Sequence, residues 1–233
     1  MSEQRPAEYH QKRFERPPGA TEILLVRHGA SAPLVEGQPF PMTDGQGDPG
    51  LAPVGQEQAV KVGARLARER IDAVYVSSMR RTHETAAPLL QHTGMSAIED
   101  RDLREVHLGD WEAGVLRRMA AQQHPTYLRM HAEQRWDVIP NAESSDAFSG
   151  RTVGSIQRIV ANHPDELVVV VCHGGVIGAI CAHATQSRPF AFGGADNASI
   201  SQLVVTEERW LLRRFNDSSH LYDTLSTAPD QMT

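Results

Sequence analysis

Two apolar runs in this 233-residue chain end in the same way, with a histidine followed by a glycine. Residues 23–26 lead into Arg27-His28-Gly29, and residues 167–172 lead into His173-Gly174. Short apolar runs of this kind are typical of buried strands in a parallel sheet. In an open α/β sheet the ligand site lies at the carboxyl ends of the strands. The two histidines are therefore predicted to meet at one edge of such a sheet.

The rest of the chain alternates apolar runs with amphipathic segments, which favours a mostly parallel sheet with helices on both faces. One strand near the C-terminus is expected to be antiparallel, because a short turn joins it to the last strand. The predicted fold class is thus α/β, a three-layer α/β/α sandwich with one antiparallel strand and a small helical cap. We expect strands at 22–27, 72–77, 96–99, 167–172, 199–205 and 209–215, and helices at 54–70, 80–93, 144–162 and 174–184.

The pattern predicts one domain, residues 21–217, between a flexible N-terminal lead (1–20) and a C-terminal tail (218–233). Residues 112–145 carry mixed helical patterns and are predicted to form the cap. The Gly- and Pro-rich stretch at 30–53 directly follows the first histidine. A loop of this length is usually functional or disordered. Because it leaves the first histidine directly, we expect it to face a substrate.

Composition excludes several classes of partner. The net charge is −6, which argues against nucleic acid or an anionic membrane as the main partner. No apolar run approaches the ~18 residues of a membrane-spanning helix. Cys172 and Cys181 lie in apolar stretches with no metal or redox spacing, so we expect buried, reduced thiols and a cytoplasmic protein.

The polar residues at the strand ends point to phosphoryl transfer. His28, as a neutral imidazole, can attack phosphorus and form a phosphohistidine. Arg27 and Arg81 can hold phosphate oxygens through their planar guanidinium groups, and a protonated His173 can add a donor. Glu105 is the candidate general acid for the leaving oxygen and then base for water. No metal or cofactor is required, because the cations are side chains.

Several assignments have competitors in the sequence. Arg80 competes with Arg81, which is favoured by its spacing to Thr85. The role of Glu105 has three alternative carboxylates, Glu84, Glu112 and Glu143.

Four motifs follow in order along the chain: Arg27-His28-Gly29, Arg81 with Thr85-Ala86, Leu103-Arg104-Glu105 with Gly109-Asp110-Trp111-Glu112, and His173-Gly174-Gly175. In these motifs, over residues of about 22–220, the chain resembles the histidine phosphatase superfamily, which includes the cofactor-dependent phosphoglycerate mutases. The resemblance implies a phosphatase that hydrolyses small phosphomonoesters. The expected substrate-binding residues are Arg27, Arg81, His173, Gly174, Ser31 and His107.

Two other functions compete with the phosphatase. The first is a phosphoglycerate mutase, although the mutase continuation of the first motif is only partly kept in Ala30-Ser31-Ala32-Pro33-Leu34. The second is a phospholigand-binding module without catalysis. Dimers occur in the family, so the resemblance also allows a homodimer.

Overall fold

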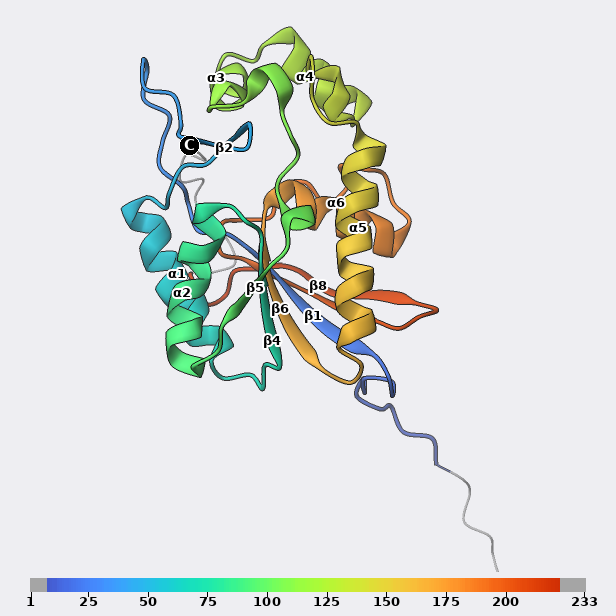
Figure 1. Cartoon of the computed structure of the whole chain (residues 1–233). Helices are drawn as coiled ribbons and strands as arrows, with labels where there is room; N and C mark the ends of the chain where they lie inside the picture. The colour runs from blue at the N-terminus through green and yellow to red at the C-terminus, as the bar shows by residue number, and fades with distance from the viewer. Residues whose placement is uncertain (1–7, 223–233) are drawn as a thin grey trace, which may run out of the picture.

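The computed structural model describes residues 8–222 and shows a six-stranded sheet between two pairs of helices (Figure 1). The strands are β1 (Thr21–Arg27), β2 (Met42–Thr43), β3 (Gln46–Gly47), β4 (Ala73–Val76), β5 (Ala97–Glu99), β6 (Leu167–Cys172), β7 (Ile200–Val205) and β8 (Trp210–Asp217). The α-helices are α1 (Pro53–Leu66), α2 (Arg80–Thr93), α3 (Val115–Ala121), α4 (Pro125–Glu133), α5 (Ser145–Asn162) and α6 (Gly174–Thr185). Three short 3-10 helices are η1 (Arg101–Leu103), η2 (Gly109–Trp111) and η3 (Trp136–Val138).

The sheet has the order β5-β4-β6-β1-β7-β8. Neighbours from β5 to β1 are parallel, whereas β7 is antiparallel to both β1 and β8. The predicted antiparallel strand is thus β7. In the central pair, β1 and β6 are in register so that Arg27 lies opposite Cys172. The chain therefore leaves both strands at the same level, which sets His28 beside His173.

Successive side chains of a strand point to opposite faces of a sheet, and β1 is apolar on both. Ile23 and Leu25 pack with residues of α5 and α6, while Leu24 and Val26 pack with residues of α1 and α2. Figure 1 shows these helix pairs on the two faces of the sheet. The predicted three-layer sandwich is confirmed.

Helix α1 is shorter than predicted and ends at Leu66 instead of residue 70. The backbone N–H of Glu69 donates to the carbonyl of Leu66, and this turn redirects the chain towards β4. Ile71 therefore packs beside the helix pair rather than on the face of α1.

The long stretch at 30–53 contains regular structure. β2 and β3 form a hairpin around Asp44-Gly45, and both turn residues have positive φ. Asp-Gly is favoured at such two-residue turns because their backbone twist matches that of the flanking strands. The hairpin carries Gln46 and Asp48 to the carboxyl edge of the sheet, where they bond to residues after β4 and η1.

Within the stretch predicted as the cap lie α3, α4 and η3, above the carboxyl edge of the sheet (Figure 1). They enclose a small core of their own around Trp111, Met130 and Ile139.

Of the predicted lead and tail, residues 1–7 and 223–233 lie outside the described part of the chain. Residues 8–19 are exposed, and Arg16 anchors them by donating to the carbonyls of Asp165 and Glu166. Between residues 8 and 222, no helix combines the length and apolar character needed to span a bilayer.

Candidate active site

His28 follows β1 and is buried at the carboxyl edge of the sheet. Its Nδ1 lies 2.7 Å from the carbonyl oxygen of Gly29, and Arg81 donates through Nε to its Nε2 at 3.2 Å. A carbonyl oxygen only accepts hydrogen bonds, so Nδ1 carries the proton and the lone pair is on Nε2. The backbone thus supplies the orienting partner that a nucleophilic imidazole needs.

The backbone around His28 is held by unusually close packing. A Cβ atom on Gly55 would lie 2.0 Å from the carbonyl oxygen of Ala30, and one on Gly29 would lie 2.5 Å from that of Gly55. Only glycines allow the start of α1 to approach the loop this closely. The N–H of Gly29 also donates to the hydroxyl of Thr85, and the amide of Asn197 donates to the carbonyl of His28.

Arg81, and not Arg80, reaches His28. The Arg81 side chain is buried, donates to His28 and to the carbonyl of Gly47, and lies 3.5 Å from Asp48. Arg80 is largely exposed and pairs with Glu84 on its own helix. The two neighbours differ because the first turn of α2 turns only one of them towards the sheet edge.

Two buried nitrogens at this edge have no acceptor in the described part of the chain, Arg27 Nε and His173 Nδ1. The ring of His173 lies edge-on to that of His28, with centroids 5.1 Å apart. Its Nε2 is bonded to the hydroxyl of Ser77 at 2.8 Å, which leaves Nδ1 as the free ring position. Since buried donors normally find a partner, these two nitrogens mark a place for an anionic ligand.

Both histidines are held neutral. Burial, followed by the positive charges of Arg81 and Arg27, holds the pKa of His28 well below its ordinary value. Burial and Arg81 act in the same direction on the pKa of His173. The lowered pKa disfavours the protonated form in which His173 was expected to add a donor. Neutral His173 donates through Nδ1–H in the tautomer whose Nε2 accepts from the hydroxyl of Ser77.

These lowered pKa values predict a stability that depends on pH. The unfolded chain binds protons at both histidines below about pH 6.5 while the folded protein does not, so stability falls as the pH drops. Each group contributes a slope of up to about 1.4 kcal/mol per pH unit. We expect the free energy of unfolding, measured by urea denaturation, to fall less steeply with decreasing pH in His28→Ala than in wild type between about pH 6.5 and 5. An equal pH dependence of the unfolding free energy in the two proteins would contradict a neutral, buried His28.

Glu105 lies between the hairpin and the start of α6. Its carboxylate accepts from the N–H groups of Gly175 and Val106, both at 3.0 Å. A Cβ on Gly175 would come within 2.4 Å of this carboxylate, so the close approach requires glycine. Glu105 is on the Arg27 side of the site and contributes an attractive charge to both Arg27 and Arg81.

The three competing carboxylates have structural partners. Glu84 accepts from the N–H of Leu51 and from Arg80. Glu112 accepts from the N–H groups of Gly47 and Leu108, which ties the hairpin to the start of the cap. Glu143 is paired with Arg151. Of the four, Glu105 is the one whose charge acts on both Arg27 and Arg81.

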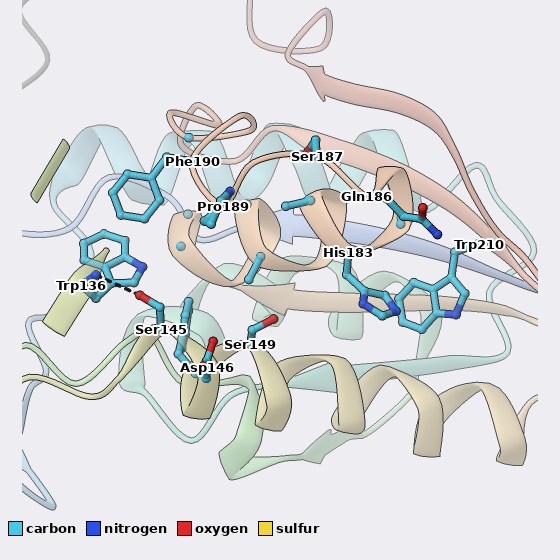
Figure 2. A pocket seen from close by; sticks show the side chains of 18 of the residues that line it. Trp136, Ser145, Asp146, Ser149, His183, Gln186, Ser187, Pro189, Phe190 and Trp210 are labelled. Carbon is cyan, nitrogen blue, oxygen red and sulfur yellow. Dashed lines mark hydrogen bonds between the residues drawn. The ribbon is translucent and has the colours of Figure 1, made fainter. Parts of the chain in front are cut away.

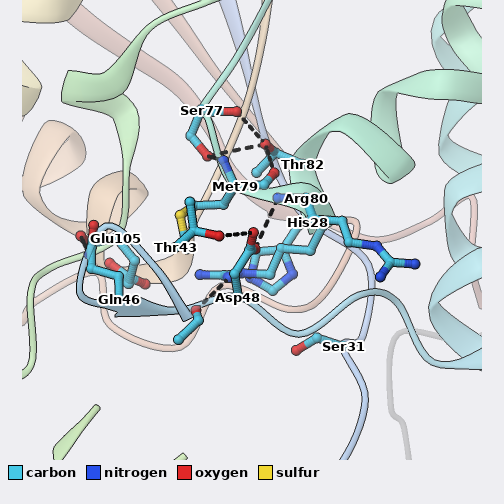
Figure 3. A network of polar contacts seen from close by, with 12 residues as sticks. His28, Ser31, Thr43, Gln46, Asp48, Ser77, Met79, Arg80, Thr82 and Glu105 are labelled. Atoms are coloured by element: carbon cyan, nitrogen blue, oxygen red, sulfur yellow. Dashed lines mark hydrogen bonds and ion pairs between the residues drawn. The ribbon is translucent and has the colours of Figure 1, made fainter. Parts of the chain in front are cut away.

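The remaining predicted contacts differ in their placement. Gly174 lies against the guanidinium of Arg27. Ser31 accepts a hydrogen bond from Arg117 of α3 and stands apart from the His28 ring in Figure 3. His107 accepts from the N–H of Gly109 through Nδ1, which turns the ring towards its own backbone.

Several residues of the site were not predicted from the sequence. Asp48 accepts a hydrogen bond from the N–H of Arg80, as Figure 3 shows. Its carboxylate also lies 3.5 Å from the guanidinium of Arg81. Arg117 reaches from the cap close enough to lower the pKa of His28 and has its own pKa lowered, first by burial and then by Arg27. Ser77 and Asn197 hold the two histidines. Among residues 8–222 there is no cluster of three His, Cys, Asp or Glu side chains arranged to hold a metal ion.

Comparison with known families explains why these residues occur together. The model of the histidine phosphatase superfamily, branch 1, matches residues 23–218, most of the chain. The chain belongs to this superfamily. The predicted resemblance is confirmed, and every motif that carried it lies within the matched region.

Histidine phosphatase relatives cover most of the chain as well. The metal-independent phosphoserine phosphatase of Arabidopsis thaliana is 33% identical over 86% of this chain and 83% of its own. Phosphoglycerate mutase-like protein 4 of the same plant is 35% identical over 87% and 88%. The structure of a mycobacterial glucosyl-3-phosphoglycerate phosphatase superimposes with a TM-score of 0.72 at 29% identity, covering 85% of this chain and all of that one. The predicted enzyme class, a phosphatase, agrees with these relatives.

Proposed function

We propose that this protein is a metal-independent phosphatase that hydrolyses small phosphomonoesters through a phosphohistidine on His28. The observation that carries the proposal is the pairing of a nucleophilic Nε2 on His28 with the unpartnered donors of Arg27 and His173. A phosphoryl group bound there is surrounded by fixed positive charge among buried side chains.

In the first step Nε2 of His28 attacks phosphorus, and the bond from phosphorus to the ester oxygen breaks. Arg27, Arg81 and the Nδ1–H of His173 hold the non-bridging oxygens while negative charge moves over them. Glu105 delivers a proton to the leaving oxygen, so that a neutral alcohol departs.

In the second step water replaces the alcohol. The carboxylate of Glu105 accepts a proton from water, whose oxygen attacks phosphorus and breaks the bond to Nε2. Inorganic phosphate leaves, and His28 returns to its neutral state. The Gly29 carbonyl keeps the proton on Nδ1 and holds the ring in place through both steps.

Arg81 and Arg80 form a matched pair for testing the phosphate contacts. Arg81→Ala is expected to lower kcat/KM by about 10²–10³-fold, because it removes a donor that strengthens as charge develops. Arg80→Ala, which removes a surface ion pair, should stay within about threefold of wild type. Steady-state kinetics on one monoester checks both variants. Equal losses would contradict the assignment of Arg81.

The relatives indicate which substrates to try first. Phosphoserine and glucosyl-3-phosphoglycerate, named for two of them, are both small phosphorylated molecules. We place the protein in the cytoplasm, because Cys172 and Cys181 are free and buried with raised thiol pKa values. One chain supplies every residue named in this site. Both a monomer and the homodimer that the family allows are therefore compatible with it.

The test is phosphate release from a panel of monoesters in the presence of chelator, from about pH 4 to 8. We expect turnover that chelator leaves unchanged. A folded protein that releases no phosphate from any monoester would contradict the proposal. A coupled assay for 3- to 2-phosphoglycerate interconversion, with and without the bisphosphate, then decides whether the mutase alternative applies.

A further inference from the structure

A groove of about 940 Å³ runs between α5 and α6 and reaches the candidate active site at Arg27 and Glu105, whereas His28, Arg81 and His173 do not line it. Arg27, Glu105, Gly174 and Gly175 line its inner end, and His183 and Trp210 line its outer end. Gly174 and His183 are nine residues apart on one helix, which corresponds to about 13 Å. Small organic ligands occupy cavities of this size, and the groove is far larger than a serine or glycerate group needs.

Small side chains on α6 line one wall of this groove, and at Gly178 they allow the backbone of Phe192 to pack closely, since its carbonyl oxygen would lie 3.2 Å from a Cβ there. Gly174, Gly178 and Ala182 follow at four-residue intervals, with Gly175 and Ala179 beside them. Residues four apart lie on one face of a helix, so this face has no side chain larger than a methyl group until His183. Phe148 and Ser149 of α5 form the opposite wall.

Aromatic pairs mark both ends of the groove (Figure 2). Trp136 and Phe190 lie with ring centroids 5.0 Å apart near the inner end, and His183 and Trp210 lie 4.8 Å apart at the outer end. The two ends therefore offer apolar surface, while Ser145, Ser149 and Ser187 add hydroxyl groups to the lining.

The inner end connects the groove to the chemistry. The unpartnered Nε of Arg27 is buried there, and the carboxyl group of Glu105 lines the same end. A leaving oxygen that takes its proton from Glu105 therefore departs at the inner end of the groove. The rest of an extended leaving group would lie in the groove between α5 and α6.

The charges around the groove limit what it accepts. Beyond Arg27 and Glu105, the lining carboxylates are Asp146, Glu207 and Glu208, and the one lining arginine of the described chain is Arg209. The groove is thus unfavourable for a leaving group that carries a second anion.

We propose that this groove is a leaving-group subsite and that the enzyme prefers phosphomonoesters of long alcohols that are neutral or cationic. The inference rests on the proposed phosphatase activity. It adds the length and charge of the substrate, which the motifs of the active site leave open.

The test uses ethyl, butyl and octyl phosphates, whose leaving alcohols have nearly the same acidity. Burial of the added methylenes should raise kcat/KM for octyl over ethyl phosphate by at least about tenfold. An octyl phosphate with a terminal amine should equal or exceed the unsubstituted ester, and one with a terminal carboxylate should be the poorest of the three.

Two variants fill the groove from opposite walls. Ala179→Leu and Ser149→Leu should bring the octyl-to-ethyl ratio to within about threefold of one while ethyl phosphate turnover stays unchanged. The control is Gln157→Leu, an exposed position of α5 outside the groove, which should keep the wild-type ratio. Using both variants keeps the test valid if one of them fails to fold.

The outcomes separate the two proposals. Turnover of ethyl and octyl phosphates at equal kcat/KM in the wild type would overturn the subsite and leave the phosphatase intact. A length preference that survives both variants would also overturn it. Absence of turnover with every monoester would instead contradict the proposed function.

Discussion

Replacement of His28 by alanine is expected to lower kcat/KM by about 10⁴-fold or more, as removal of a catalytic nucleophile does in other enzymes. The phosphate-binding donors of Arg27 and Arg81 remain in this variant, so it should still bind inorganic phosphate. The loss is therefore expected in kcat rather than in affinity. Kinetics together with phosphate binding by calorimetry measures the two separately.

His92→Ala is the matched control for this variant. His92 lies on the exposed side of α2, where its Nδ1 bonds to the carbonyl of Pro88. Its loss should leave kcat/KM within about threefold of wild type. If His28→Ala kept as much activity as His92→Ala, another group would have to attack phosphorus.

The second large effect is expected from Glu105→Gln. Glutamine keeps an acceptor for the N–H of Gly175 but cannot transfer a proton, so hydrolysis of an alkyl phosphate should slow by about 10²–10⁴-fold. Formation of the phosphoenzyme from p-nitrophenyl phosphate should be affected much less, because its leaving group departs without a proton. Pre-steady-state release of nitrophenol against phosphate release from an alkyl ester measures this difference.

Glu84→Gln is the control, because Glu84 has partners on Leu51 and Arg80 and no contact with the histidines. We expect near wild-type rates with both esters. An equal loss for the two esters in Glu105→Gln would show that Glu105 positions other groups without moving a proton.

The sequence was sufficient to predict the fold class and the meeting of the two histidines. Both depend on local patterns, because an apolar run followed by His-Gly indicates a strand with a histidine at its carboxyl end. The register that places Arg27 opposite Cys172 follows from packing those runs side by side in one parallel sheet. The choice of Arg81 over Arg80 came from motif spacing, and the burial of Arg81 agrees with it.

Other features depend on contacts between distant segments. Arg117 belongs to no motif and reaches the site only because α3 lies over residues 31 and 32. Asp48 is placed by the β2–β3 hairpin. The Asp44-Gly45 dipeptide indicates such a hairpin in the sequence, whereas the spacing of apolar residues does not. The neutral state of His173 depends on its burial and on the positive charge of Arg81, which no sequence pattern reports.

The most direct test of the account is to trap the intermediate. Glu105→Gln is mixed with p-nitrophenyl phosphate and chelator, quenched in alkali and analysed by peptide mass spectrometry, with the double variant that also carries His28→Ala as the blank. We expect one phosphoryl group on His28 and none in the blank. A phosphoryl group on another residue, or nitrophenol release with no phosphoenzyme, would contradict it.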